Sequence, residues 1–266
     1  MPIWAYRISP VLLALVMMLA IETVAMIGLF ITRRFLLPRL HFHDGVNDAI
    51  SGTVQAIGVF YGITVGLIAA GVWNTSTNAA DLVSKEAAAI GALYRDVTGY
   101  PSPQKEILQT KLRDYTIFTI ERAWPAQNEG RLLEGGTEIL DQFHMQLYSF
   151  EPVGANQTAL HSEALTAFNK VSEYRSLRID AVSSGLSPIM WTVIWVGAGI
   201  SIGVAYLYKL EDPKLHAILV SLMAGFLAVV LFMIVINDRP FFGADSVSPA
   251  PYQLILKRLI LHGADY

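Results

Sequence analysis

The chain has 266 residues, of which 53% are hydrophobic and only 15% charged, whereas soluble domains carry about 25% charged residues. With a mean hydropathy of +0.45, this composition excludes an ordinary water-soluble enzyme. The formal charge of −3 leaves no basic excess to neutralise phosphates, which argues against nucleic acid as a partner. Because the sequence holds no cysteine, disulfides, thiolate zinc sites and cysteine nucleophiles are excluded as well.

Four apolar runs are long enough to cross a bilayer, whose hydrocarbon core of about 30 Å takes roughly 20 helical residues. They cover residues 10–32, 49–73, 188–208 and 215–236. The first run is closed by Arg33 and Arg34, and it is longer than the apolar stretch of a signal peptide, so we interpret it as a retained span. The sequence therefore predicts an all-α fold with four transmembrane helices.

Residues 74–187 form an insert between spans two and three that carries most of the charge and has helical periodicity. We expect helices over residues 76–98, from Ser102-Pro103 to Pro125, and over 136–150 and 157–184. Spans two and three should then continue out of the membrane as long helices. The predicted divisions are 1–73 for the first membrane pair, 74–187 for the insert, 188–236 for the second pair and 237–266 for a C-terminal segment.

The orientation of the spans in the membrane is not decided by charge. Four spans place the insert and both termini on one side of the bilayer and the two short loops on the other. Lys and Arg residues flank both sides in similar numbers, so the positive-inside rule gives no clear preference.

Span two carries two stripes of residues at a spacing of four. One stripe is small throughout and lets another backbone approach closely, and it consists of Gly58, Gly62, Gly66 and Ala70. The other contains a single large aromatic residue that could constrict a pore, and it consists of Gly52, Ala56, Phe60 and Thr64. A second interpretation stays open, in which the glycines pack spans within one subunit and Phe60 fills a gap.

Glu22 lies near the middle of span one, where an unpaired charge costs roughly 2.5 to 3.5 kcal/mol. It should therefore face protein or water, or be protonated. Its expected partners are helix carbonyls or the polar side chains of span two, namely Thr53, Gln55 and Tyr61. The carboxyl group could contact an ion or a proton in transit, or it could be a neutral acid that only helps the helices pack.

The remaining polar clusters give little support for chemistry. His41-Phe42-His43-Asp44 resembles a metal-binding group, but without a third distant ligand an interfacial turn is the better interpretation. The segment from Asn237 to Gly243 is typical of a local cap and turn after a helix. No phosphate-binding glycine loop, nucleophile elbow or zinc-helix motif is present in the sequence. We therefore predict no enzymatic activity, no cofactor and no metal site.

Two segments resemble the bestrophins. Gly58-Val59-Phe60-Tyr61 followed by Trp73-Asn74 is similar to their second membrane helix, which carries Gly-Phe-Tyr and then Trp-Asn beyond the bilayer. The segment from Asn237 to Asp245 is similar to the Asn-Pro-Phe-Gly and acidic stretch after their last membrane helix. Nearly the full chain resembles the bacterial bestrophin-like family, with the matching residues Asp238, Arg239, Pro240 and Phe241 and then Val247 to Pro249.

The resemblance implies a pentameric channel whose second helix lines a central pore, with Phe60 at the apolar neck that gates it. Ala56 and Gly52 fall where the bestrophin neck has bulky apolar residues, so this neck should be wider or closed differently. Calcium gating in animal bestrophins needs a run of acids after the glycine, of which only Asp245 is present here. The resemblance also places the chain in a bacterial inner membrane, with the insert and the termini in the cytoplasm.

The leading hypothesis is thus an oligomeric ion channel whose partners are copies of itself, the lipid bilayer and the permeating ions. Its main rival is a non-conducting membrane scaffold or sensor whose insert binds a partner. A third possibility is a small transporter with Glu22 as its proton site, although inverted repeats and broken helices are not evident.

Overall fold

The computed structural model describes residues 8–40, 45–243 and 246–257, and all regular elements in these ranges are helices. The chain divides into two compact units. One comprises Met1–Thr75 with Gly185–Asp238, and the other comprises Ser76–Ser184 with Arg239–Tyr266. Helix α2 (Val46–Val97) supplies residues to both units.

The first unit holds the helices that are long and apolar enough to cross a membrane. These are α1 (Pro10–Ile31), the first half of α2, α7 (Pro188–Ala205) and α8 (Pro213–Asp238). Helix α1 is extended by a π-helical turn, η2 (Thr32–Leu36), and a 3-10 turn, η3 (Leu37–Arg39). The four predicted spans are confirmed as helices, with ends within three residues of those predicted except at the end of span two, where the helix continues into the insert.

Polar side chains determine where the membrane helices begin. Ser9 accepts a hydrogen bond from the Leu12 amide at the start of α1, and Ser187 accepts one from the Met190 amide at the start of α7, each ahead of a proline in the first turn. Asp212 accepts from the Lys214 amide at the start of α8. Each cap satisfies an amide that has no partner within its helix.

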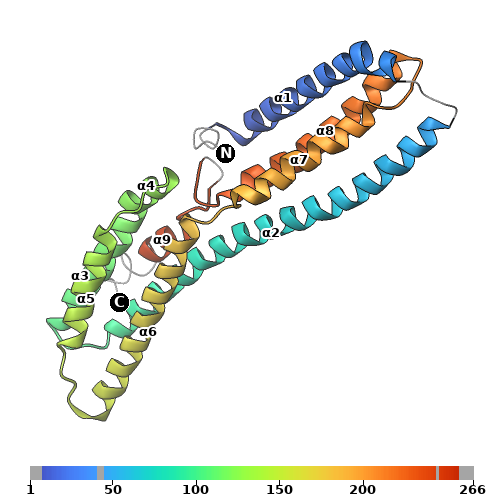
Figure 1. Cartoon of the computed structure of the whole chain (residues 1–266). Coiled ribbons are helices and arrows are strands. Elements are labelled where there is room, and N and C mark those ends of the chain that lie inside the picture. The colour runs from blue at the N-terminus through green and yellow to red at the C-terminus, as the bar shows by residue number, and fades with distance from the viewer. Residues whose placement is uncertain (1–7, 41–44, 244–245, 258–266) are drawn as a thin grey trace. The chain divides into compact units, whose positions relative to one another are not determined.

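Helices α1 and α8 lie side by side in this unit (Figure 1). Their contact is a cluster of small and aliphatic side chains that the end of α7 completes, and it consists of Ala25, Leu29, Ala205, Val220 and Ala224. Small residues let helix backbones approach closely, which is the usual basis of packing between membrane helices. Gly28 in α1 serves the same purpose, because a Cβ there would lie only 2.5 Å from the Tyr206 hydroxyl.

Helix α2 has 52 residues and is about 78 Å long at 1.5 Å per residue, which exceeds the roughly 30 Å of a hydrocarbon core. The expectation that span two continues directly into the insert is therefore confirmed. The corresponding expectation for span three is wrong. Helix α6 (Gly154–Val182) ends before α7 begins, because Pro188 cannot donate a helical hydrogen bond and Ser187 before it is extended, with ψ of 154°.

The second unit packs the rest of α2 with α3 (Gln104–Phe118), α4 (Trp124–Asn128), α5 (Gly135–Tyr148), α6 and the short α9 (Ala250–Ile255). Its core contains buried aliphatic and aromatic residues from several of these helices, including Val83, Ile90, Leu93, Leu108, Leu112, Phe143, Leu147 and Val171. Helices α3 and α5 lie side by side in Figure 1.

The predicted helix end at Pro125 is wrong by about one turn. A π-helical segment, η4 (Thr119–Ala123), links α3 to α4, and the helix ends only at Asn128. The Trp124 amide bonds the Thr119 carbonyl, so the backbone is already widened where Pro125 removes a donor. Helix α9 was not among the predicted elements.

Candidate functional site

The stripe of α2 predicted to line a pore is exposed in the single chain. Phe60 has 72% of its surface exposed, and Gly52, Ala56 and Thr64 are also exposed. The Thr64 hydroxyl donates to the Phe60 carbonyl at 2.8 Å within the same helix. An aromatic ring that is exposed to this extent gains little burial from its own chain.

The opposite side of α2 is held by α7. The Tyr61 hydroxyl donates to the Ile194 carbonyl at 3.0 Å, and a Cβ on Gly197 would overlap the Tyr61 ring. Val65 is buried on the same side. At about 100° per residue, Val65 lies roughly 140° around the helix from Phe60. The contact with α7 thus determines the rotation of α2 and turns Phe60 away from the chain's own membrane helices.

The glycine stripe does not pack spans together within the subunit. A Cβ added at Gly58, Gly62 or Gly66 would meet no atom of another described element within 4 Å, and Ala70 is exposed. The small residue at the contact between α2 and α7 is instead Gly197, on α7. A role for the stripe in packing against another copy of the chain remains a prediction.

Glu22 has a partner different from those expected. The Ser221 hydroxyl of α8 donates to its Oε2 at 3.0 Å, and a Cβ on Gly225 would lie 3.2 Å from its Oε1. The expectation of a partner in span two is wrong, because α1 packs along α8 and Tyr61 bonds α7 instead. The carboxyl group therefore contributes to the contact between α1 and α8.

The segment after α8 makes structural contacts. The Phe242 amide donates to the Arg239 carbonyl at 3.0 Å, and the Arg239 guanidinium lies 5.4 Å from the Phe242 ring centre, which confirms the expected turn. The Pro240 carbonyl accepts from the Val247 amide at 2.8 Å. Phe241 is fully buried. These contacts help to fold the second unit.

Asp238, at the end of α8, has a partner far back in the sequence. Its Oδ1 accepts from the Leu186 amide at 2.6 Å. This hydrogen bond joins the end of α8 to the residues that lead into α7. Asp238 is thus more than a local helix cap, because it closes the α7–α8 pair at the end opposite its connecting loop.

Two sequence features fall on residues that the structure does not describe. The segment from His41 to Asp44 and the acidic Asp245 lie outside the described ranges, so the interpretations given to them stay predictions. Within residues 8–40, 45–243 and 246–257, no group of three or more His, Cys, Asp or Glu side chains could hold a metal ion.

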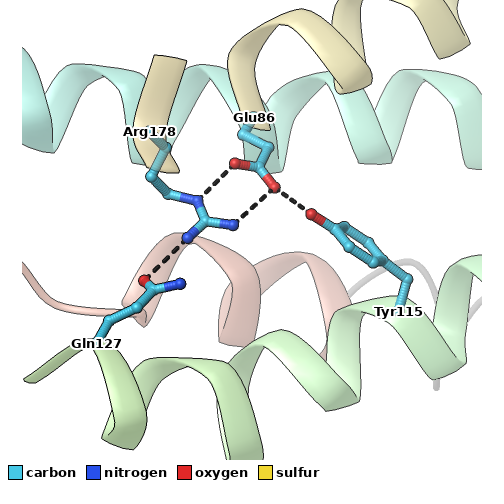
Figure 2. Close-up of polar contacts among 4 residues, drawn as sticks. All are labelled: Glu86, Tyr115, Gln127 and Arg178. Atoms are coloured by element: carbon cyan, nitrogen blue, oxygen red, sulfur yellow. Dashed lines mark hydrogen bonds and ion pairs between the residues drawn. The ribbon is translucent and has the colours of Figure 1, made fainter. Parts of the chain in front are cut away.

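A buried polar network in the second unit was missed by the sequence analysis (Figure 2). Arg178 of α6 donates from Nε to Oε2 of Glu86 in α2 at 2.6 Å and from Nη1 to Oε1 of Gln127 at 2.9 Å. The Tyr115 hydroxyl of α3 donates to Oε1 of Glu86 at 2.6 Å. Arg178 is 2% exposed and Glu86 is fully buried, so the network joins α2, α3, α4 and α6 inside the core.

The electrostatics of this network keep Arg178 charged. Burial by itself lowers the pKa of Arg178, but the adjacent Glu86 carboxylate more than offsets this effect, so the pKa is raised and the guanidinium stays charged. Burial, and then the negative charge of Glu86, raises the pKa of Tyr115 well above its usual value. Trp124 adds a cation–π contact, with the guanidinium carbon 5.6 Å from its ring centre.

One signal in the sequence could have identified this site. Glu86 stands three residues after Val83 and four before Ile90, both of which are fully buried, so it shares their face of α2. A carboxylate on a core face requires a buried partner. The sequence gives no comparable signal for which of its basic residues that partner is.

Comparison with known proteins gives a consistent assignment. A family model described as a Bestrophin-like domain matches residues 19–252. No match was found among curated protein sequences. Two variants of a bacterial bestrophin homologue from Klebsiella pneumoniae superpose with TM-scores of 0.68 at 10% and 11% identity, and each alignment covers 95% of this chain and 99% of the other. A structure described as a membrane protein gives 0.68 at 9% identity with the same coverage.

At these identities the solved structures establish the fold, which is that of the bestrophin homologue over the aligned 95% of this chain. The family model rests on the sequence and spans most of the chain, including the later part of α1, the other three membrane helices and the insert. The chain is therefore an integral membrane protein that belongs to the bestrophin-like family.

Proposed function

We propose that the protein is an ion channel assembled from several copies of this chain, with α2 of each copy lining a central pore and Phe60 forming the neck. The observation that carries the proposal is the rotation of α2. Tyr61 and Val65 face the chain's own helices, while Phe60, about 100° and 140° around the helix from them, is exposed on a helix long enough to cross the bilayer. In a ring of copies, the side that carries Phe60 can face the axis.

A neck of this kind would act by excluding water. A ring of phenyl groups is an apolar constriction, and such constrictions close channels by dewetting. Ala56 and Gly52, one and two turns before Phe60, carry almost no side chain, so the constriction would be one residue deep. We expect a shallow barrier that is sensitive to the size of the side chain at position 60.

The assembly is proposed to be a pentamer, by analogy with the bestrophins. The exposed small residues Gly58, Gly62, Gly66 and Ala70 would let neighbouring helices approach each other closely. The proposed location is a bacterial inner membrane, with the insert and termini in the cytoplasm. Neither an enzymatic reaction nor a cofactor is part of the proposal.

Ion flux through purified protein in liposomes tests the proposal. Phe60→Ala removes the ring and should raise the flux several-fold. The control is Val59→Ala, at the preceding residue of the same helix, which is 59% exposed. This variant should leave the flux near the wild-type level. Equal fluxes for the two variants would refute the neck.

The subunit number of the purified protein, measured by native mass spectrometry, separates the channel from its rival. A ring of subunits that conducts ions supports the proposal. A monomer or dimer with no flux across a panel of salts and pH values would overturn it in favour of the scaffold or sensor.

A further inference from the structure

The membrane unit contains a pocket of about 360 Å³ that the channel proposal does not use. It lies between the turns that follow α1 and the loop that joins α7 to α8, and it is lined by Arg33, Leu37, Pro38, Leu40, Lys209 and Leu210. Two of the six lining residues are cationic, and the other four are apolar. That combination fits neither a purely hydrophobic ligand nor a small hydrated ion.

Arg33 is held in place by its neighbours. Its Nη1 donates to the Leu210 carbonyl at 3.1 Å and to Nδ1 of His216 at 3.0 Å. Because a guanidinium can only donate, Nδ1 must be the acceptor and the imidazole is neutral. Nε2 of His216 then donates to the Ala205 carbonyl at 3.1 Å, and His216 is 1% exposed. The arginine is therefore anchored on one nitrogen, and its other donors are available for the pocket.

Lys209 is held by its backbone rather than its side chain. Its amide donates to Oδ1 of Asn47 at 3.0 Å, and its carbonyl accepts from Nδ2 of Asn47 at 3.0 Å. The residue itself is exposed. In the part of the chain that the structure describes, no carboxylate forms an ion pair with Arg33 or Lys209. Among the described residues, the two cations that line the pocket therefore have no ion-pair partner.

The position of the pocket along the chain is what a headgroup site requires. Arg33 follows the end of α1 and Lys209 follows the end of α7, so both residues stand at the ends of membrane spans. A guanidinium matches the geometry of phosphate oxygens, and basic pockets between membrane helices bind anionic headgroups. The leucine and proline walls suit the glycerol and the first acyl carbons.

We infer that this pocket binds the phosphate headgroup of an anionic phospholipid, with Arg33 and Lys209 on the phosphate oxygens and the apolar walls against the lipid backbone. Inorganic phosphate offers the same oxygens without the apolar part, so it is the alternative source that the experiment must separate. The inference is independent of whether the protein conducts ions.

The test titrates the detergent-purified full chain with dioctanoyl phosphatidylglycerol, dioctanoyl phosphatidylcholine or inorganic phosphate and follows thermal unfolding. A ligand that binds only the folded protein raises its melting temperature, and the stabilisation grows with the logarithm of the ligand concentration once that concentration exceeds Kd. We expect phosphatidylglycerol to stabilise the protein in this way, phosphatidylcholine to need at least a tenfold higher concentration for the same shift, and phosphate to cause no shift. An equal response to phosphate or to phosphatidylcholine would overturn the inference.

Lys214 provides a matched control in the same loop region. Like Lys209 it is exposed and held through its backbone, in this case by Oδ1 of Asp212 at 2.8 Å, but it does not line the pocket. Lys209→Gln should weaken phosphatidylglycerol binding about tenfold, and Lys214→Gln should leave it unchanged. Because Lys209 is exposed and both of its hydrogen bonds to Asn47 are made by its backbone, its variant keeps the test valid even if Arg33 variants misfold. Equal effects of the two lysine variants would mean nonspecific attraction and would refute the site.

Discussion

Glu86 and Arg178 show how a single pair of residues can organise the insert. Both side chains are buried, and together they bond Tyr115 and Gln127 from two further helices. Removing two charges from water is expensive, and their attraction repays the cost only when the remaining hydrogen-bonding groups are satisfied. The main effect of this pair is therefore on the geometry in which the helices pack. Its net contribution to the free energy of unfolding is small.

Loss of one partner should be more harmful than loss of both charges. Arg178→Met leaves the Glu86 carboxylate buried and unpaired, so we expect a loss of about 3–5 kcal/mol in unfolding free energy. Adding Glu86→Gln should recover part of that loss, because an amide can still bond Tyr115. Thermal or denaturant unfolding in detergent measures both effects.

The exposed pair of Lys85 and Asp81, at 2.6 Å, supplies the control for this experiment. Lys85→Met removes a cation of similar length from a solvated ion pair, and we expect little change in stability. A double variant at Glu86 and Arg178 that is less stable than Arg178→Met alone would contradict our account of the buried pair.

Alkaline pH should destabilise the insert through its buried tyrosines. Burial raises the pKa of Tyr100 to about 12 and raises that of Tyr115 further, whereas a phenol in the unfolded chain ionises near pH 10. Between those values the folded state binds more protons than the unfolded state, so stability is intact below pH 10 and falls as pH rises above it.

Melting temperatures measured between pH 8 and pH 11.5 check this expectation. Tyr115→Phe removes one of the titrating phenols, so its curve should fall less steeply above pH 10 than that of the wild type, even if it starts lower. A wild-type curve that is flat through pH 11.5, or identical slopes in the two proteins, would contradict the prediction.

At the level of single residues, the sequence predicted some positions and missed others for identifiable reasons. Glu22 was recognisable because a charge in an apolar span stands out, but its partner Ser221 depends on which helices pack together, and this was predicted incorrectly. The network of Glu86 and Arg178 joins residues 92 positions apart, and no local pattern encodes such a pairing.

At the scale of elements, the contact between α2 and α7 controls which side of α2 is exposed. It depends on the absence of a side chain at Gly197, over which the Tyr61 ring lies while its hydroxyl bonds the Ile194 carbonyl. The ring cannot move away freely without losing that hydrogen bond. The packing of this helix pair is therefore sensitive to a single methyl group.

Gly197→Ala should disturb this contact, and Gly199→Ala is its matched control. Both substitutions raise helix propensity equally, but a Cβ at Gly199 meets no described atom within 4 Å. We expect Gly197→Ala to lower the unfolding free energy by about 1–3 kcal/mol relative to Gly199→Ala, as overpacking does. Equal melting temperatures for the two variants would refute the close contact.

The sequence predicted the ends of a helix correctly where residues at those ends determine them. The spans were predictable from the length of their apolar runs, and the start of α7 coincides with Ser187 and Pro188. The error at Pro125 arose because a proline is compatible with a helix that is already widened by a π-turn. The break between α6 and α7 was missed because apolar periodicity continued up to it.

At the scale of the whole molecule, four spans require that the insert and the loop between α7 and α8 face opposite sides of the membrane. The native chain has no cysteine, so single cysteines can be introduced without background labelling. Asn169 in α6 and Glu211 in the loop are both exposed and suit this purpose.

We expect Glu211→Cys to react with a membrane-impermeant maleimide in intact bacterial cells, and Asn169→Cys to react only after the cells are permeabilised. This result would place the insert in the cytoplasm. The reverse pattern would invert the proposed orientation, and labelling of both positions in intact cells would be incompatible with four spans.

A hydrogen bond joins α7 and α8 near each end of their hairpin. Asp238 bonds the Leu186 amide at one end, and His216 bonds the Ala205 carbonyl at the other. Because a hydrogen bond joins the helices near each end, neither helix can slide along the other without breaking one of these bonds. The register of α7 against α8 is therefore fixed. A conformational change of the membrane unit that keeps both hydrogen bonds must therefore move α7 and α8 together.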